Sequence, residues 1–148
     1  MRLFFGFGLS ATEALALADW RDRCTRCDGR AVPAANFHIT LGFLGELKPN
    51  KLDALVSSAD RVLDKAAISD HAMVLDQVGY WPKPGSFWTG PNRWPDSVDQ
   101  LAAALRDLAV RFGARRERAA FQPHVTLFRR CQTPPPAPTE NPQIRLAA

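Results

Sequence analysis

The sequence has no long apolar segment, and it contains few cysteines and few histidines. The one stretch that suggests a leader is the apolar run from Leu3 to Leu9, which is far shorter than the ~20 residues of a membrane span. Ser10-Ala-Thr-Glu13 follows directly and is typical of a helix capping box. We therefore interpret the run as a buried first strand rather than a signal peptide, and we expect a cytoplasmic protein with no membrane partner.

The cysteine content argues against a disulfide framework. Cys24, Cys27 and Cys131 make an odd count, which favours a reducing compartment. The Cys24-x-x-Cys27 spacing lacks the second such pair, or the paired histidines, that would complete a zinc site. We predict instead that Cys24 and Cys27 are small apolar residues on one helical face.

Length and charge set broad limits. With 148 residues, 46% of them hydrophobic, the chain is long enough for one compact domain and short for two. The formal net charge of +4 permits a polyanionic partner without requiring one.

Residue patterns predict an α+β fold. The turn sequence Pro82-Lys-Pro84-Gly85 joins two strand-like segments and favours antiparallel pairing. The proline-rich segment 133–138 predicts a surface loop. The expected elements are strands at 2–9, 36–44, 72–80, 86–90, 123–129 and 143–146, with helices from the capping box to about Cys27, from a cap at Asn50, and from Ser97 to a terminal Gly113.

The most informative feature is a weak internal repeat. His38-Ile-Thr40-Leu and His124-Val-Thr126-Leu share one template and lie more than half the chain length apart. Each follows an amphipathic segment and falls in an expected strand, where residues i and i+2 share a face. Each histidine should therefore stand beside its own threonine, while the residues between them face the core.

This pattern suits metal-free acid–base chemistry on a phosphate. One imidazole can act as general base on water and the other as general acid on the leaving oxygen, because histidine titrates near neutrality. Each threonine hydroxyl can donate to a non-bridging phosphate oxygen. No carboxylate cluster suited to Mg²⁺ accompanies the motifs, so we expect neither a metal nor a cofactor. The third histidine, His71, is expected to be a solvated loop residue.

At these residues the sequence resembles the 2H phosphoesterase superfamily, specifically the RNA 2′,3′-cyclic phosphodiesterases, also called 2′-5′ RNA ligases. The similarity extends over about residues 2–130. It is carried by Arg2-Leu-Phe-Phe5, Asn36-Phe-His-Ile-Thr-Leu-Gly-Phe-Leu-Gly45, Tyr80-Trp-Pro-Lys-Pro, Phe87-Trp88 and Phe121-Gln-Pro-His-Val-Thr-Leu-Phe-Arg129.

The resemblance implies a single domain over residues 1–148 with two pseudo-symmetric lobes. It also implies two antiparallel sheets that face a central cleft, with helices packed outside. The family continues past its last strand with further aromatic residues, so we expect the C-terminal part to be shortened. A monomer is the expected state.

The implied activity is hydrolysis of a terminal 2′,3′-cyclic phosphate to a 2′-phosphomonoester, with RNA joining through a 2′-5′ bond as a related reaction. The implied partners are RNA ends, tRNA fragments among them. By family analogy His38 protonates the departing 3′ oxygen and His124 activates water. The symmetry of the motifs leaves the reverse assignment open.

Further binding residues follow from the resemblance and from residue type. Arg129 matches a phosphate-binding arginine of the family, although strand alternation turns it away from His124 unless the strand ends or bulges. Arg130 is the alternative. Candidates for base stacking are Phe43, Tyr80 and Trp88. The loop arginines Arg115, Arg116 and Arg118 are candidates for tracking an RNA backbone.

Three other hypotheses remain open on the sequence. The substrate can be a small cyclic nucleotide instead of an RNA end. The chain can be a non-catalytic RNA-binding module, although simple binding does not require two titratable histidines. It can be a metal hydrolase that uses His38, His71 and His124, although carboxylate ligands are lacking nearby.

Overall fold

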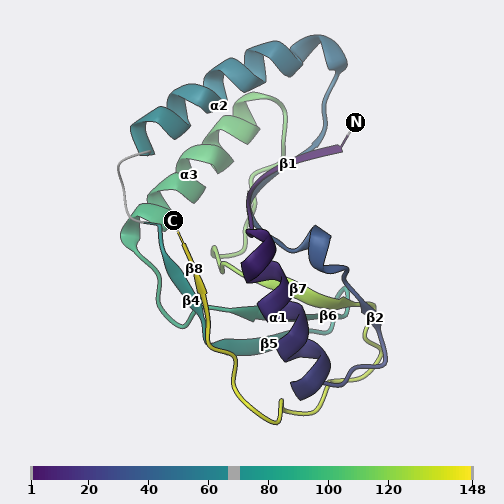
Figure 1. The fold of residues 1–148 in the computed structure, drawn as a ribbon. Helices are drawn as coiled ribbons and strands as arrows, with labels where there is room; N and C mark the ends of the chain where they lie inside the picture. Colours follow the sequence, from purple (N-terminus) through teal and green to yellow (C-terminus); the bar gives the residue numbers. More distant parts are fainter. Residues whose placement is uncertain (1, 67–70, 148) are drawn as a thin grey trace. The chain divides into compact units, whose positions relative to one another are not determined.

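The computed structural model describes residues 2–66 and 71–147, and Figure 1 shows its elements. Within these residues the strands are β1 (Arg2–Gly8), β2 (Arg30–Ala31), β3 (His38–Glu46), β4 (Met73–Leu75), β5 (Gln77–Trp81), β6 (Ser86–Gly90), β7 (Val125–Arg129) and β8 (Ile144–Leu146). The helices are α1 (Ala11–Cys24), α2 (Leu52–Ala66) and α3 (Asp96–Arg111), with 3₁₀ turns at Ala34–Asn36 and Pro49–Lys51.

The chain forms two compact units. Unit 1 contains Met1–Phe7, Thr40–His71 and Pro95–Gln122, and unit 2 contains Gly8–Ile39, Ala72–Trp94 and Pro123–Ala148. Helices and antiparallel strand pairs occur as separate segments, so the predicted α+β class is confirmed.

Unit 2 is built on a four-stranded sheet with the order β2-β7-β6-β5, whose three strand pairs are all antiparallel. The helix α1 lies along this sheet (Figure 1). Arg21 of α1 is buried there, and its Nη1 donates to the carbonyl oxygens of Val32 and Leu127. Its guanidinium also lies 5.6 Å from the Phe128 ring centroid. The Arg21 guanidinium thus links α1 to the sheet through two backbone carbonyls and the Phe128 ring.

The capping box predicted for α1 is confirmed. The Ser10 hydroxyl accepts from the Glu13 backbone N–H, and the Glu13 carboxylate accepts from the Ser10 backbone N–H. The same carboxylate accepts a bond from the Ala147 N–H at 2.8 Å, next to β8, which itself pairs with β4. These donors, Ala147 first, hold the pKa of Glu13 below its usual value.

Unit 1 contains α2 and α3, which pack against each other, and most of β1 and β3, which pair. The apolar stripe of α3 is buried as expected from a helical period. Gly113 follows the helix in a left-handed conformation, φ 101°, as predicted for a residue that ends a helix. The buried residues of α3 are Val98, Leu101, Ala102, Leu105, Leu108 and Ala109.

Three expected boundaries were wrong. Asn50 does not cap α2, because Pro49 starts a 3₁₀ turn that contains it. The expected strand at 72–80 divides at Asp76, whose carboxylate accepts from the Asn92 backbone, so that β4 and β5 join different sheets. β7 begins at Val125, directly after His124, since Pro123 has no N–H for a strand ladder.

The cysteine prediction was also wrong. Cys27 forms a disulfide with Cys131 across a sequence separation of 104, and only Cys24 is a free, buried thiol of α1. α1 ends at Cys24 because Thr25 is extended and both its backbone N–H and its hydroxyl donate to the Arg21 carbonyl. Cys27 therefore leaves the helical face. An odd cysteine count does not exclude one bridge, and the argument for a reducing compartment loses this support.

No helix within residues 2–66 and 71–147 is long and apolar enough to cross a membrane.

Candidate functional site

A β-bulge in β7 determines which side chains share a face of the unit 2 sheet. The register pairs Phe128 with Phe87 but Thr126 with Trp88, so two steps along β7 match one step along β6. Leu127 is the extra residue, and it reverses the alternation of side chains beyond it. The ring of Phe128 accordingly stacks on that of Phe87, with centroids 5.9 Å apart, on the face opposite Thr126.

One face of this sheet carries the second predicted motif. Trp88 and Thr126 are directly opposite each other and therefore share a face. His124, just before β7, lies on the same face, because its ring contacts Trp88 with centroids 5.8 Å apart. We call this surface the His124 face, and the surface that carries Phe87 and Phe128 the α1 face.

Trp81 lies closer to the His124 ring than Trp88 does. The Trp81 and His124 ring centroids are 4.6 Å apart at an interplanar angle of 81°, an edge-to-face arrangement. Trp81 also lies 4.9 Å from Trp88, which the hairpin register places on the same face. Two indoles from β5 and β6 thus restrict the orientation of the His124 imidazole. Trp88 itself is 7% exposed, so it offers little ring surface for the base stacking expected of it.

The first histidine is oriented by the backbone. The Nδ1 of His38 lies 2.8 Å from the carbonyl oxygen of Asn36. Because a carbonyl can only accept, Nδ1 carries the proton, and Nε2 is the nitrogen that can exchange one. His38 is half-buried and belongs to unit 2, the unit that also contains His124.

Both His-x-Thr motifs show the expected alternation. His38 and Thr40 are half-buried, and so are His124 and Thr126. The residues between and after them are buried at 2% exposure or less: Ile39, Leu41, Val125 and Leu127. Each threonine hydroxyl therefore accompanies its histidine, while the apolar neighbours anchor the strand in the core.

The bulge resolves the difficulty over Arg129. Arg129 is five positions from His124, but the extra residue Leu127 brings it to the His124 face. Arg129 is the exposed last residue of β7. Arg130 follows outside the strand with a left-handed backbone, φ 58°. Of the two, only Arg129 shares a face with Thr126 by strand geometry.

The remaining aromatic candidates occupy different surroundings. Phe43 is 56% exposed in unit 1, and its ring lies 6.4 Å from that of Phe4. Tyr80 is paired with Phe87, which places it on the α1 face, and its hydroxyl donates to the Cys131 carbonyl at 2.9 Å. Tyr80 therefore binds the backbone just after β7 and does not share the face of His124.

Of the predictions on polar surface residues, the one for His71 needs revision. His71 is half-buried, with Nδ1 3.1 Å from the Ser97 hydroxyl and Nε2 3.0 Å from the Ala66 carbonyl, so it is not a solvated residue. In the basic loop, Arg116 pairs with Asp107 at 2.8 Å. Arg115 and Arg118 are exposed.

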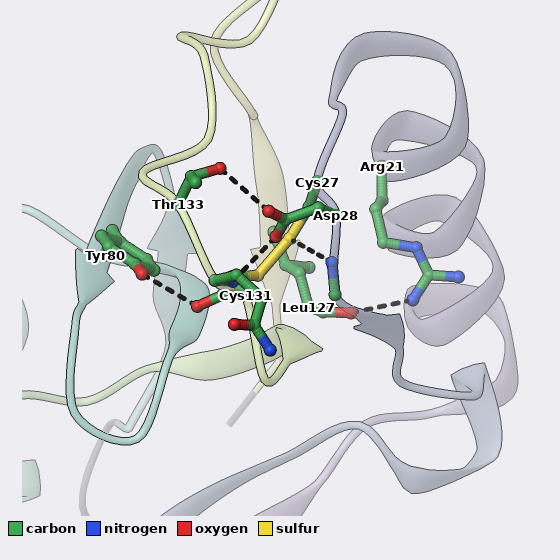
Figure 2. Close-up of a disulfide and its surroundings, with 9 residues drawn as sticks. Arg21, Cys27, Asp28, Tyr80, Leu127, Cys131 and Thr133 are labelled. Carbon is green, nitrogen blue, oxygen red and sulfur yellow. Dashed lines mark hydrogen bonds between the residues drawn. A yellow bond between two sulfur atoms is a disulfide. The ribbon is translucent and has the colours of Figure 1, made fainter.

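The disulfide belongs to a larger structure that fastens the end of β7, shown in Figure 2. The Asp28 carboxylate accepts from the Gln132 backbone N–H at 2.8 Å and from the Thr133 hydroxyl at 2.9 Å. These donors, Gln132 first, hold the pKa of Asp28 below its usual value. We call the Cys27–Cys131 bridge and the Asp28 bonds the clasp.

The clasp is also the one group of three closely spaced candidate metal ligands in the described part of the chain. Cys27, Asp28 and Cys131 offer ligand atoms within 4.8 Å of one another. Both sulfurs are joined to each other and both carboxylate oxygens accept hydrogen bonds, so these groups are already engaged.

Sequence reasoning missed Trp81 as a site residue. The sequence pattern around the turn could have indicated it. Trp81 and Trp88 flank a tight turn, and the pairing of Trp81 with Ser86 places both indoles on one face. It also missed the pairing of Arg30 with Arg129, because β2 has only two residues and gives no periodic pattern.

With both motifs set in an antiparallel α+β framework, the chain belongs to the LigT-like phosphoesterase family, whose pattern matches residues 9–88. The resemblance inferred from the motifs is thereby confirmed.

Two curated relatives carry the same name. The RNA 2′,3′-cyclic phosphodiesterase of Escherichia coli is 36% identical over 129 residues, which are 86% of this chain and 71% of the relative. The RNA 2′,3′-cyclic phosphodiesterase of Geobacillus stearothermophilus is 30% identical over 98 residues, or 66% of this chain, which spans only 31% of that relative.

Among solved structures, E. coli LigT complexed with 3′-AMP aligns with a TM-score of 0.79 at 33% identity. The alignment covers 98% of this chain and 83% of that one.

Proposed function

We propose that this chain is an RNA 2′,3′-cyclic phosphodiesterase that opens a terminal 2′,3′-cyclic phosphate to a 2′-phosphomonoester. The observation that carries the proposal is the presence of two complete His-x-Thr motifs with oriented imidazoles in a member of this family. The two named relatives act, by their names, on RNA 2′,3′-cyclic phosphates.

The reaction needs one proton accepted and one donated. A water oxygen attacks phosphorus while His124 takes its proton, and the P–O3′ bond breaks while His38 protonates the departing 3′ oxygen. The products are a 2′-phosphate and a 3′ hydroxyl, and the histidines return to their starting states by exchange with solvent. The bond from His38 Nδ1 to Asn36 makes Nε2 the nitrogen that transfers its proton.

The threonines and Arg129 stabilise the charge that develops on phosphorus oxygens. Thr40 and Thr126 donate hydroxyl hydrogen bonds to the non-bridging oxygens, and Arg129 supplies a guanidinium from the His124 face. Phe43 has an exposed ring on which a base can stack, whereas the Trp88 ring packs against His124. Arg130 is the second choice for the phosphate.

Several finer points belong to the same proposal. The roles of His38 and His124 can be exchanged by the symmetry of the motifs. The 2′-5′ ligase activity would use the same displacement with an RNA 5′ hydroxyl in place of water, so that a P–O5′ bond forms while the P–O3′ bond breaks and the 3′ oxygen is protonated. The single-domain organisation, the monomeric state and the cytoplasmic location remain predictions.

The test is hydrolysis of a short RNA that ends in a 2′,3′-cyclic phosphate, with excess EDTA. The wild type should form a 2′-phosphate, and His124→Ala and His38→Ala should each lower kcat by about 10²–10⁴. His71→Gln is the matched control, since His71 is bonded to Ser97 and Ala66 and lies outside the motifs.

The alternatives make different predictions in this assay. Turnover of 2′,3′-cyclic AMP but not of RNA would favour a small cyclic nucleotide as the substrate. Binding of RNA without turnover of either compound would favour a binding module, and loss of activity in EDTA would favour a metal hydrolase.

A further inference from the structure

Two arginines face each other at the edge of the unit 2 sheet. Arg30 on β2 is directly opposite Arg129 on β7, and both are exposed. Directly opposite residues share a face, and like charges in that position are destabilising. Neither arginine forms an ion pair with a carboxylate among the described residues. The fold thus holds two arginines at directly opposite strand positions without an ion-paired carboxylate among the described residues.

The face on which they lie is that of the catalytic histidine. The bulge at Leu127 places Arg129 on the His124 face, and the β2–β7 register assigns Arg30 to the same face. Ala31, the next residue of β2, is paired with Phe128 of the α1 face, which agrees with this alternation. Arg30 therefore extends the row formed by Trp88, Thr126 and Arg129 by one further strand.

The clasp, shown in Figure 2, lies at one end of the β2–β7 strand pair. Cys27 and Asp28 precede Arg30, and Cys131 follows Arg129 by two residues, and in an antiparallel pair these positions lie at the same end. Gly29, between Asp28 and Arg30, lies so close to the Arg129 carbonyl that a β-carbon at position 29 would collide with it. A covalent bridge and two carboxylate hydrogen bonds therefore stabilise a strand pair whose own charges repel.

We infer that Arg30 and Arg129 form a two-phosphate site, in which Arg129 binds the reacting cyclic phosphate and Arg30 binds the next phosphate of the same RNA strand. The inference rests on the proposed function. A mononucleotide has only the first phosphate, whereas an oligonucleotide presents both. The geometry thus identifies an RNA end, rather than a free cyclic mononucleotide, as the substrate that uses the whole site.

The test compares two substrates that differ in the second phosphate: 2′,3′-cyclic AMP and an RNA trinucleotide that ends in a 2′,3′-cyclic phosphate. Arg30→Ala should raise KM for the trinucleotide about tenfold, since one charge-assisted contact is lost, while kcat/KM for 2′,3′-cyclic AMP stays within about twofold. Arg129→Ala should impair both substrates. Arg145→Ala, which removes an exposed arginine of β8, is the matched charge control and should change neither.

Salt dependence gives a second readout. Because each phosphate contact on a single strand contributes a slope of about 0.7 in the plot of log affinity against log salt, Arg30→Ala should reduce the slope for the trinucleotide by about that amount. The slope for 2′,3′-cyclic AMP should not change.

Two outcomes would overturn the inference: an equal loss on both substrates, which would make Arg30 structural or part of the reacting-phosphate site, or no loss on the trinucleotide. If the wild type turns over neither compound, the proposed function fails instead. Fluorescence anisotropy with a labelled trinucleotide carrying a terminal 3′-phosphate then still measures whether Arg30→Ala weakens binding about tenfold and lowers the salt slope.

Discussion

Gly79 lies directly opposite Trp88 in the β5–β6 hairpin, and the indole ring fills the space that a β-carbon at position 79 would need. The absence of a side chain on one strand is thus what allows the indole on the next to lie flat against the sheet. Since Trp88 in turn contacts His124, Gly79 on β5 affects the packing of the His124 ring two strands away.

Replacement of Gly79 by alanine should therefore displace Trp88 and disturb His124. We expect a loss of about 1–3 kcal/mol in the free energy of unfolding from overpacking, with a fall in kcat. Urea unfolding followed by tryptophan fluorescence, together with steady-state kinetics, measures both. Gly8→Ala is the control, because a β-carbon at position 8 meets open space. Unchanged stability and activity in Gly79→Ala would contradict the packing described.

Trp81 should matter for turnover more than for binding. Its indole touches the His124 imidazole edge to face, and such aromatic pairs contribute about 0.5–1.5 kcal/mol beyond area burial. Trp81→Leu should lower kcat by up to about tenfold with little change in KM, and Trp81→Phe should restore most of the loss. The comparison requires full kinetic curves for both variants. A purely structural tryptophan would instead reduce the amount of folded enzyme in both and leave kcat per folded molecule unchanged.

The clasp should stabilise unit 2 through its disulfide. Reduction, or the Cys27→Ala/Cys131→Ala double substitution, should cost about 2–5 kcal/mol in the free energy of unfolding, as for other bridges that close long loops. Denaturant unfolding with and without dithiothreitol checks this. Cys24→Ser keeps the bridge and removes the free thiol, so its unfolding should still respond to dithiothreitol. A wild type whose midpoint is insensitive to dithiothreitol would show that the bridge contributes little.

Asp28 should make the stability of the clasp depend on pH. Bonds from the Gln132 backbone and the Thr133 hydroxyl lower its pKa in the folded chain below the unfolded value of about 3.9. The stabilisation is therefore complete above that value and is lost as the pH falls through the folded pKa. Asp28→Asn should be less stable than the wild type at pH 7, and the difference should shrink below about pH 4.

Denaturant midpoints measured from pH 7 down to pH 3 test this, with Asp60→Asn on α2 as the charge-matched control. If the difference between wild type and Asp28→Asn were the same at every pH, the lowered pKa would have no part in it.

Elements with a clear period or end signal could be predicted from the sequence. The amphipathic stripe of α3, the Ser10 capping box and the hairpin around residues 82–85 are all local, since the residues that determine each lie within a few positions of one another. The pairing of each histidine with its threonine also follows from strand alternation alone.

The features that were missed depend on contacts between distant segments. β2 has two residues and exists only because β7 lies beside it, so no local pattern marks Arg30 as a strand residue. Cys27 finds Cys131 across 104 residues, and cysteine counting does not predict such a pairing. The bulge at Leu127 is visible only once β6 is placed beside β7. These tertiary contacts determine the face on which Arg129 lies, and no local sequence pattern predicts them.

Because of the bulge, His124 and Arg129 share a surface although they are an odd number of positions apart. In a regular strand, only an even separation returns a side chain to the same surface, and the separation of His124 from Arg129 is odd. Removal of the extra residue would make the separation even and the strand regular, so the arginine would stay on the surface of His124. Insertion of one residue between Thr126 and Arg129, with the bulge kept, would leave every functional residue type in place and yet turn the arginine to the opposite surface.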